Sequence, residues 1–263
     1  MKPNYENWMP KWMVVSAYIG AKILLIASII FLLFAINASP TFFIPFGVSL
    51  ALGGFVLSVA ILFHKMRVDF DYDGKRHLMK TVAEGTVQYV SLKKGDKALD
   101  VGCGSGVLTI ALAKRFPDAE IFGIDRWGKE YASFNKPLCE KNARIEGVDN
   151  TRFLQGNAVK LPFEDESFDA IVSNYVYHNI PTLDRQAILL ESLRTLKKGG
   201  SFAIHDIFSK AKYGDMDDFV KKLKAMGYQE VELIDTTDGL FFKDKKEAKK
   251  LMLQHSKLLK GIK

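Results

Sequence analysis

The sequence contains very little cysteine, which limits the kinds of fold it can form. Only Cys103 and Cys139 occur in 263 residues. Two cysteines are too few for a disulfide framework or for a four-ligand zinc site. Their scarcity is consistent with a reducing compartment. The chain also lacks internal repeats and low-complexity segments, so nothing in it indicates a repeat architecture.

Charge is almost absent from residues 13–63. The stretch Met13–Ile36 contains one charged residue, Lys22, and the stretch Thr41–Phe63 contains none. A bilayer core of ~30 Å requires roughly 20 apolar residues in a helix, so both stretches are long enough to cross it. We therefore predict a two-helix transmembrane hairpin at residues 13–63. A cleaved signal peptide is the alternative for the first stretch, but its apolar part is long and a second apolar stretch follows at once.

The charges that flank this hairpin predict its orientation. Basic residues lie before the first span and after the second, whereas the loop between the spans has none: Lys2, Lys11, Lys65 and Arg67. The positive-inside rule then places both termini and the following domain in the cytoplasm, with residues 1–12 as a cytoplasmic N-terminus. The expected location is the cell membrane, with two spans. Lys22 either extends its side chain to the interface or binds an anionic head group.

Positive charge is concentrated near the C-terminus. The net charge is +7, and residues 243–263 hold eight lysines against Asp244 and Glu247. The rest of the chain is nearly neutral, so we expect no nucleic-acid partner. Apolar residues recur every three or four positions in this segment. The spacing predicts a basic amphipathic helix at 243–263, which either binds membrane lipids or packs on the domain with its lysines in solvent.

Residues 81–242 alternate apolar strands with amphipathic helices, after a linker at residues 64–80. Strands are expected at KALDVG, EIFGID, TRFLQGNA, SFDAIVSN and SFAIHDIF, and QEVELID and GLFF are expected to form a final hairpin. Strands that alternate with helices indicate a parallel sheet with helices on both faces. The predicted fold class is therefore α/β, with a Rossmann-like sheet that follows the transmembrane hairpin.

The strongest local signal is LDVGCGSG, which ends the first of these strands. Gly102, Gly104 and Gly106 allow the backbone to approach a ligand closely. The helix that follows offers free N–H groups and the positive end of its dipole. The dinucleotide pattern G-x-G-x-x-G fails because Val107 stands at its last position, and no Walker lysine follows.

The spacing Asp100-x-Gly102-x-Gly104-x-Gly106 resembles motif I of the class I S-adenosylmethionine (SAM)-dependent methyltransferases. The resemblance covers roughly residues 80–235 and is greatest with the ubiquinone/menaquinone-biosynthesis branch. It implies that the glycine turn holds the methionine part of SAM and that Asp100 helps to hold its amino group. Asp125 would bind the ribose hydroxyls, and Asn157-Ala158 stands where the family has an acidic-alanine pair for the adenine amino group. The implied cofactor-binding residues are Asp100, Gly102, Cys103, Gly104, Gly106, Asp125, Arg126, Trp127, Asn157, Ala158 and Asn174; Trp127 either lies against the adenine or belongs to the core.

The fourth strand ends in polar residues, in the segment IVSNYVYHNI. Ligands of open α/β sheets bind outside the carboxyl ends of the strands, so this segment should lie beside the methyl group to be transferred. His178, Tyr175 and Tyr177 are the catalytic candidates, and His178 is suited to act as a general base. His178 can instead orient the substrate or only pack the loop. His205 and Asp206 should approach the same pocket, but the spacing of these residues fits no known metal site and we expect no metal.

Taken together, these features predict a membrane-anchored SAM-dependent methyltransferase that acts on a lipid or hydrophobic small molecule at the cytoplasmic face. In one alternative, the acceptor is a soluble small molecule or protein and the hairpin serves only for localisation. In another, the chain is a non-catalytic SAM-binding membrane scaffold, which the departure at Asn157 favours. A nicotinamide oxidoreductase is the remaining alternative.

Overall fold

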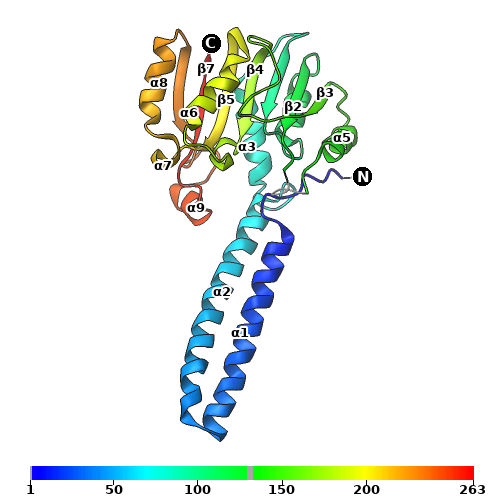
Figure 1. Cartoon of the computed structure of the whole chain (residues 1–263). Coiled ribbons are helices and arrows are strands. Elements are labelled where there is room, and N and C mark those ends of the chain that lie inside the picture. Colours follow the sequence, from blue (N-terminus) through cyan, green and yellow to red (C-terminus); the bar gives the residue numbers. More distant parts are fainter. Residues whose placement is uncertain (1, 129–132) are drawn as a thin grey trace. The chain divides into compact units, whose positions relative to one another are not determined.

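A computed structural model describes residues 2–128 and 133–263, and the chain divides into two compact units (Figure 1). Residues 7–77 form the first, which we call the hairpin unit. The N-terminal residues up to Glu6 and residues 78–263 form the second, which we call the sheet unit.

The hairpin unit consists of two long helices, α1 (Lys11–Asn37) and α2 (Phe43–Phe70), joined by the 3-10 turn η1 (Pro40–Phe42). Small residues lie where the helices meet, and a side chain added at Gly53 would come within 3.0 Å of Leu25. Most large apolar side chains of both helices are exposed. A helix pair that is apolar all round and packs through small residues is typical of a membrane hairpin. Both helices are long and apolar enough to cross a membrane, by length and composition.

The base of the hairpin is held by polar contacts of its own. The Arg67 guanidinium donates to the Met9 carbonyl over 2.6 Å, and the Asn7 amide donates to the Arg67 carbonyl over 2.9 Å. The ring of Trp8 meets that of Phe70 edge-on. Helix α2 therefore continues through residues 64–70, which we had expected to be linker.

The sheet unit is built on a seven-stranded sheet in the order β3-β2-β1-β4-β5-β7-β6. Five strands pair in parallel: β1 (Lys97–Val101), β2 (Glu120–Asp125), β3 (Thr151–Gln155), β4 (Phe168–Asn174) and β5 (Leu196–Ile207). Strand β7 (Ser256–Ile262) is antiparallel to both of its neighbours, β5 and β6 (Gln229–Asp235). The predicted α/β sheet is confirmed, and β6 pairs with β7 instead of with GLFF.

Helices cover both faces of this sheet (Figure 1). The helices of the sheet unit are α3 (Leu78–Thr86), followed by the 3-10 turn η2 (Val87–Tyr89), α4 (Val107–Arg115), α5 (Lys136–Ile145), α6 (Arg185–Arg194), α7 (Lys210–Tyr213), α8 (Met216–Ala225) and α9 (Lys245–Lys250), and α9 lies beyond the end of the sheet. One buried apolar cluster contains Leu189 of α6 and Phe219 of α8. A second contains Ala83 of α3 and Leu112 of α4. These two clusters are the cores on the two faces of the sheet.

The predicted amphipathic helix at residues 243–263 is wrong. Only α9 is helical there, and Ser256–Ile262 form β7 in the interior of the sheet. Leu258 belongs to one core cluster and Leu259 to the other, so the strand is buried on both faces. Pairing on two sides satisfies its backbone groups, and this outweighs the helical spacing of its apolar residues. The domain therefore extends beyond residue 242, its predicted end.

The N-terminal residues that precede the hairpin belong to the sheet unit. The Asn4 N–H donates to the Asn142 side-chain oxygen, and the Asn142 amide donates back to the Asn4 carbonyl, each over 2.8 Å. The Tyr5 hydroxyl donates to Glu146 over 3.0 Å. Asn142 also donates to the Ser105 carbonyl in the glycine turn. Residues 1–12, expected to form a separate cytoplasmic N-terminus, are thus divided between the two units.

Candidate active site

The glycine turn connects β1 to α4 and lies against the segment that follows β4. The N–H groups of Gly102 and Cys103 both donate to the Ile124 carbonyl, over 2.7 and 3.1 Å. Gly102 has a φ of 80°, and a Cβ at this position would overlap the Val176 side chain. Gly106, at φ 89°, is the N-cap residue that precedes α4. Glycine is therefore required at Gly102 both for its conformation and for the close approach.

Asp100, at the end of β1, has one carboxylate oxygen that is buried without a partner. Its Oδ2 accepts the Thr109 hydroxyl over 2.7 Å. Its Oδ1 has no hydrogen-bond partner within residues 2–128 and 133–263. Burial raises the pKa of Asp100 to about 7 despite the Thr109 hydrogen bond, and the nearby Asp125 charge adds to the rise. A buried oxygen of this kind would be stabilised by a cationic donor, so it fits the ammonium group of SAM.

Asp125, at the end of β2, holds the glycine turn in place. Its Oδ2 accepts the Gly104 N–H over 2.9 Å, and its Oδ1 accepts the Trp127 N–H over 2.7 Å. A carboxylate has about four acceptor positions, so two remain for the hydroxyls of a ribose. The Trp127 indole donates to the Gly104 carbonyl over 2.9 Å, which places its ring against the turn. Arg126 is exposed, and its carbonyl accepts from Gln155.

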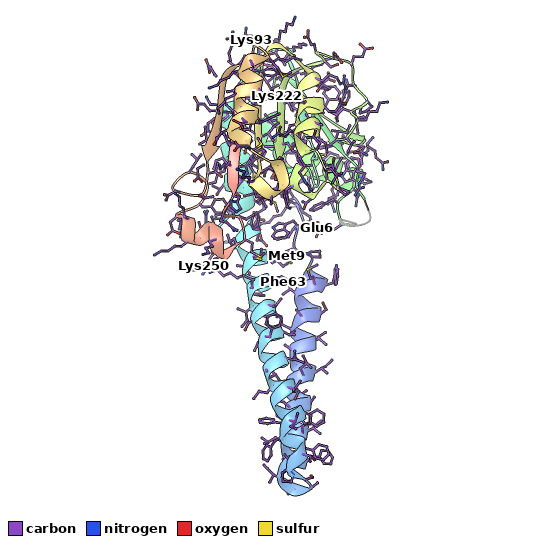
Figure 2. The ribbon with its side chains drawn as sticks, turned by 60° about the vertical axis from the view of Figure 1, so that its left-hand side comes forward. Glu6, Met9, Phe63, Lys93, Lys222 and Lys250 are labelled. Atoms are coloured by element: carbon purple, nitrogen blue, oxygen red, sulfur yellow. The ribbon has the colours of Figure 1, made fainter. Side chains whose placement is uncertain are left out.

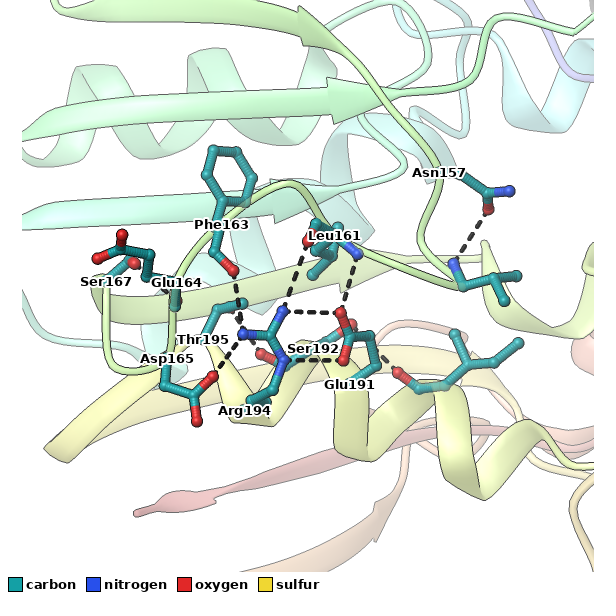
Figure 3. A network of polar contacts seen from close by, with 12 residues as sticks. Asn157, Leu161, Phe163, Glu164, Asp165, Ser167, Glu191, Ser192, Arg194 and Thr195 are labelled. Atoms are coloured by element: carbon teal, nitrogen blue, oxygen red, sulfur yellow. Dashed lines mark hydrogen bonds and ion pairs between the residues drawn. The ribbon is translucent and has the colours of Figure 1, made fainter.

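The loop after β3 presents Asn157 and Ala158. The Asn157 side-chain oxygen accepts the Val159 N–H over 3.0 Å, which closes a tight turn. The amide NH₂ is then the group that Asn157 offers to a ligand, and it suits a ring nitrogen of adenine better than the adenine amino group. Figure 3 shows how Arg194 of α6 holds this loop, through the Phe163 carbonyl and the Asp165 carboxylate.

His178 lies in the turn η4 (Tyr177–Asn179) that follows β4, and the end of β5 holds it. Its Nδ1 is 2.5 Å from Oδ1 of Asp206, and its backbone N–H donates to Oδ2 over 3.3 Å. The imidazole is 12% exposed and the carboxylate is fully buried. Burial alone would raise the pKa of Asp206, but hydrogen bonds led by that from His178 hold the pKa below its usual value. Asp206 is therefore ionised and can only accept hydrogen bonds, so the short contact places a proton on Nδ1 of His178.

Tyr175 has a left-handed backbone at the end of β4, with a φ of 56°. Its N–H donates to the His205 carbonyl over 2.8 Å, and its hydroxyl shares a hydrogen bond of 2.9 Å with Ser256. Burial raises the pKa of this phenol, so it does not act as a base near neutral pH. A strained conformation of this kind is typical of functional sites.

His205, whose carbonyl accepts the hydrogen bond from Tyr175, is fully buried. Its ring nitrogens are 2.8 Å from the Asn174 side chain and 2.9 Å from the Thr236 hydroxyl. Burial lowers the pKa of His205 to about 3, although the Asp206 charge opposes the shift. The ring is therefore neutral and supports the site as a hydrogen-bonding group instead of as a base.

Tyr177 differs from its neighbours because it belongs to the core. It is fully buried among apolar side chains, and its hydroxyl shares a hydrogen bond of 2.8 Å with Ser192 of α6. Burial raises the pKa of this phenol as well. We therefore leave Tyr177 out of the proposed catalytic set.

The Tyr177→Phe variant tests this assignment. Loss of one buried hydrogen bond should lower the free energy of unfolding by about 1 kcal/mol and leave the turnover number unchanged. Thermal unfolding and a methyl-transfer assay on the same preparation measure the two effects. A large loss of turnover without loss of stability would return Tyr177 to the catalytic set.

Comparison with known proteins identifies the family to which this chain belongs. The methyltransferase-domain family profile matches residues 92–254. The chain is 32% identical over 138 residues to the demethylmenaquinone methyltransferase of Geobacillus stearothermophilus, covering 52% of this chain and 55% of the relative. It is 41% identical over 113 residues to that of Staphylococcus aureus strain Newman, covering 42% and 43%. The chain thus spans about half the length of the curated relatives it matches.

Solved structures share the fold of the sheet unit. A SAM-dependent methyltransferase from Aquifex aeolicus superposes with a TM-score of 0.51 at 18% identity, covering 72% of this chain and 94% of that one. A geranyl diphosphate methyltransferase in complex with GPP and sinefungin gives 0.52 at 17% identity, covering 72% and 80%.

The fold and the site define a class I SAM-dependent methyltransferase domain, with SAM as the cofactor. The match over residues 92–254 shows that the chain belongs to the methyltransferase-domain family. The glycine turn and the unpartnered oxygen of Asp100 fit this cofactor.

The raised pKa of Asp100 predicts that cofactor binding depends on pH. The ammonium group of SAM favours the ionised carboxylate, so below a pKa of about 7 binding must first remove a proton. We expect SAM affinity to be about tenfold weaker at pH 6 than at pH 8, with proton release on binding near pH 6. Titration calorimetry in two buffers of different ionisation enthalpy measures both. The Asp100→Asn variant should bind SAM weakly and without this pH dependence; an unchanged dependence would assign it to another group.

Proposed function

We propose that this chain is a membrane-anchored enzyme that transfers the methyl group of SAM to a lipid-soluble, quinone-like acceptor at the cytoplasmic face of the membrane. The observation that carries the proposal is the presence, on one chain, of a SAM site and of two helices long enough to span a bilayer. An acceptor dissolved in the bilayer gives such helices a purpose that a water-soluble acceptor does not. The similarity to demethylmenaquinone methyltransferases supports a quinone-like ring.

The protein contributes mainly position and a proton acceptor. SAM supplies an activated methyl group on a sulfonium, a good leaving group, so orientation of the acceptor accounts for much of the catalysis. His178 takes the proton that the acceptor loses, at Nε2, while Asp206 holds Nδ1–H and stabilises the imidazolium. Tyr175 closes the site beside His178, with ring centroids 6.2 Å apart.

A comparison of two acceptors tests the proposal. The full chain is reconstituted in nanodiscs and supplied with methyl-labelled SAM. One set of discs contains a demethylated quinol with a polyprenyl tail; the other receives the same head group without the tail, in solution. We expect rapid methylation of the lipid in the same disc and slow methylation of the soluble head group. Equal rates at equal concentrations would favour a soluble acceptor, with the hairpin used only for localisation.

A further inference from the structure

The segment between β6 and β7 carries a concentrated basic surface. Five exposed lysines lie on or beside α9: Lys243, Lys245, Lys246, Lys249 and Lys250. The two acidic side chains among them are engaged with backbone N–H groups. Asp244 accepts the Glu247 N–H over 2.8 Å, and Glu247 accepts the Lys243 N–H over 2.7 Å. With both carboxylates counted, residues 243–250 carry five positive and two negative charges, a net charge of +3.

Two large apolar side chains are exposed beside these lysines. Leu240 is 41% exposed and Met252 is 62% exposed. Their exposure does not result from a loosely packed segment, because Phe242 and Leu251 are buried close by. Phe241 is also buried, and it packs so closely on α3 that a Cβ at Gly85 would overlap its ring. We call the five lysines with Leu240 and Met252 the α9 surface.

The α9 surface lies at the end of the sheet that holds the candidate active site, where β5 ends. Strand β6 runs parallel to β5, since both are antiparallel to β7, so the segment after β6 leaves the sheet where β5 ends. The Phe208 N–H donates to the His255 carbonyl over 2.9 Å, and the Phe241 ring meets that of His205, with centroids 5.0 Å apart. Figure 2 places Lys250 at the opposite end of the sheet unit from Lys93 and Lys222.

We propose that the α9 surface docks on the anionic head groups of a lipid bilayer. Lysines attract anionic lipids, and apolar side chains of the size of leucine and methionine enter the boundary between head groups and acyl chains. Lipid fits this surface better than nucleic acid because the remainder of the chain is nearly neutral. The inference rests on the proposed function, in which α1 and α2 keep the sheet unit beside a membrane. Docking turns the end of the sheet that bears His178 and Asp206 toward a lipid-soluble acceptor.

A spin label at residue 252 tests the docking in the full chain. The Met252→Cys variant can be labelled selectively because Cys103 and Cys139 are buried, and the chain without the added cysteine controls for background. The labelled chain is reconstituted in nanodiscs of phosphatidylcholine alone, or of phosphatidylcholine and phosphatidylglycerol in equal parts. We expect the label to become accessible to oxygen and protected from a water-soluble nickel reagent only in the anionic discs, and high salt should reverse the change.

Matched lysine variants show whether the effect is local. Each lysine near an anionic surface contributes roughly a fivefold factor, so glutamine at Lys245, Lys246, Lys249 and Lys250 should lower the ratio of docked to undocked label by more than ~100-fold. The control replaces four exposed lysines of the opposite end by glutamine: Lys93, Lys94, Lys222 and Lys224. The control should leave the ratio unchanged.

Three results would overturn the inference. In the first, the label stays in water in both kinds of disc. In the second, the control variant loses as much docking as the α9 variant. In the third, the label is protected equally in both kinds of disc, which would indicate a protein partner or a second copy of the chain. Resistance of the chain to alkaline extraction and its methyl transfer in detergent are measured on the same samples. Insertion and turnover without docking would overturn only this inference, whereas failed insertion would overturn the proposed function with it.

Discussion

The His178→Ala variant is expected to lose ~10²–10⁴-fold in the turnover number for methyl transfer while it retains the SAM affinity of the unsubstituted chain. The side chain is the partly exposed partner of a buried, ionised Asp206, and we propose that its Nε2 accepts the proton. Its imidazole is held by Asp206, which is not among the groups proposed to hold the cofactor. Single-turnover rates and SAM titrations on the reconstituted chain measure the two quantities separately.

Two further variants separate proton transfer from packing. Asp206→Asn keeps the shape of the side chain but removes the charge that orients and stabilises the imidazolium, so we expect a loss of at least tenfold in turnover, again with SAM affinity retained. Asn179→Ala, at an exposed neighbour in the same turn, should behave as the unsubstituted chain. Full turnover in His178→Ala would show that this histidine only packs the loop.

The Gly102→Ala variant is expected to bind SAM at least ~100-fold more weakly and to unfold more easily. The left-handed conformation at φ 80° costs about 1–2 kcal/mol for alanine. Its Cβ would also overlap Val176, and overpacking of this kind costs about 1–3 kcal/mol. The combined loss of a few kcal/mol should lower the melting temperature of the sheet unit by roughly 5–15 °C.

A second glycine separates the two causes. Gly95 has nearly the same conformation, with a φ of 82°, but its added Cβ would meet nothing within 4 Å. Gly95→Ala should therefore cost only the conformational part, about 1–2 kcal/mol, and leave SAM affinity unchanged. Adding Val176→Ala to the Gly102→Ala chain should recover part of the stability. Equal losses in the two single variants would show that the close approach to Val176 has no role.

The sequence signals for the expected cofactor residues are local, and the structure brings Asp125 into contact with the glycine turn. Asp100 and the three glycines lie within seven residues, and each residue type is fixed by a conformation or a charge required at that point. Asp125, at the end of the next strand, was implied only by the family resemblance. The contacts at Trp127 and Asn157 were not predictable in this way, because each depends on a turn whose shape the spacing does not reveal.

The substrate half depends on contacts between distant segments. Tyr177 and His178 are adjacent in the chain, yet the turn η4 buries Tyr177 completely and leaves His178 partly exposed. Nothing in their spacing distinguishes them. The pairing of His178 with Asp206 requires β4 and β5 to be neighbours with their ends aligned, and the register that pairs Asn174 with His205 provides this.

The sequence prediction gave a helix for the C-terminal strand because its apolar residues fit the period of an α-helix as well as that of a buried β-strand. A strand buried on both faces need not alternate, so its pattern overlaps that of a short amphipathic helix. Gly261 was the available signal, since glycine is a poor helix former. In β7 a Cβ at that position would lie 2.8 Å from the Phe202 ring, so glycine allows two elements to pack closely there.

The most direct test of the account is to follow the methyl group without choosing the acceptor in advance. Membranes that contain the full chain are incubated with methyl-labelled SAM, then separated into lipid, protein and aqueous fractions. We predict that label enters the lipid fraction, in a product with a redox-active ring, and that His178→Ala membranes show almost none. Label that is found only in protein or in water-soluble products, with SAM still bound, would contradict a bilayer-dissolved acceptor.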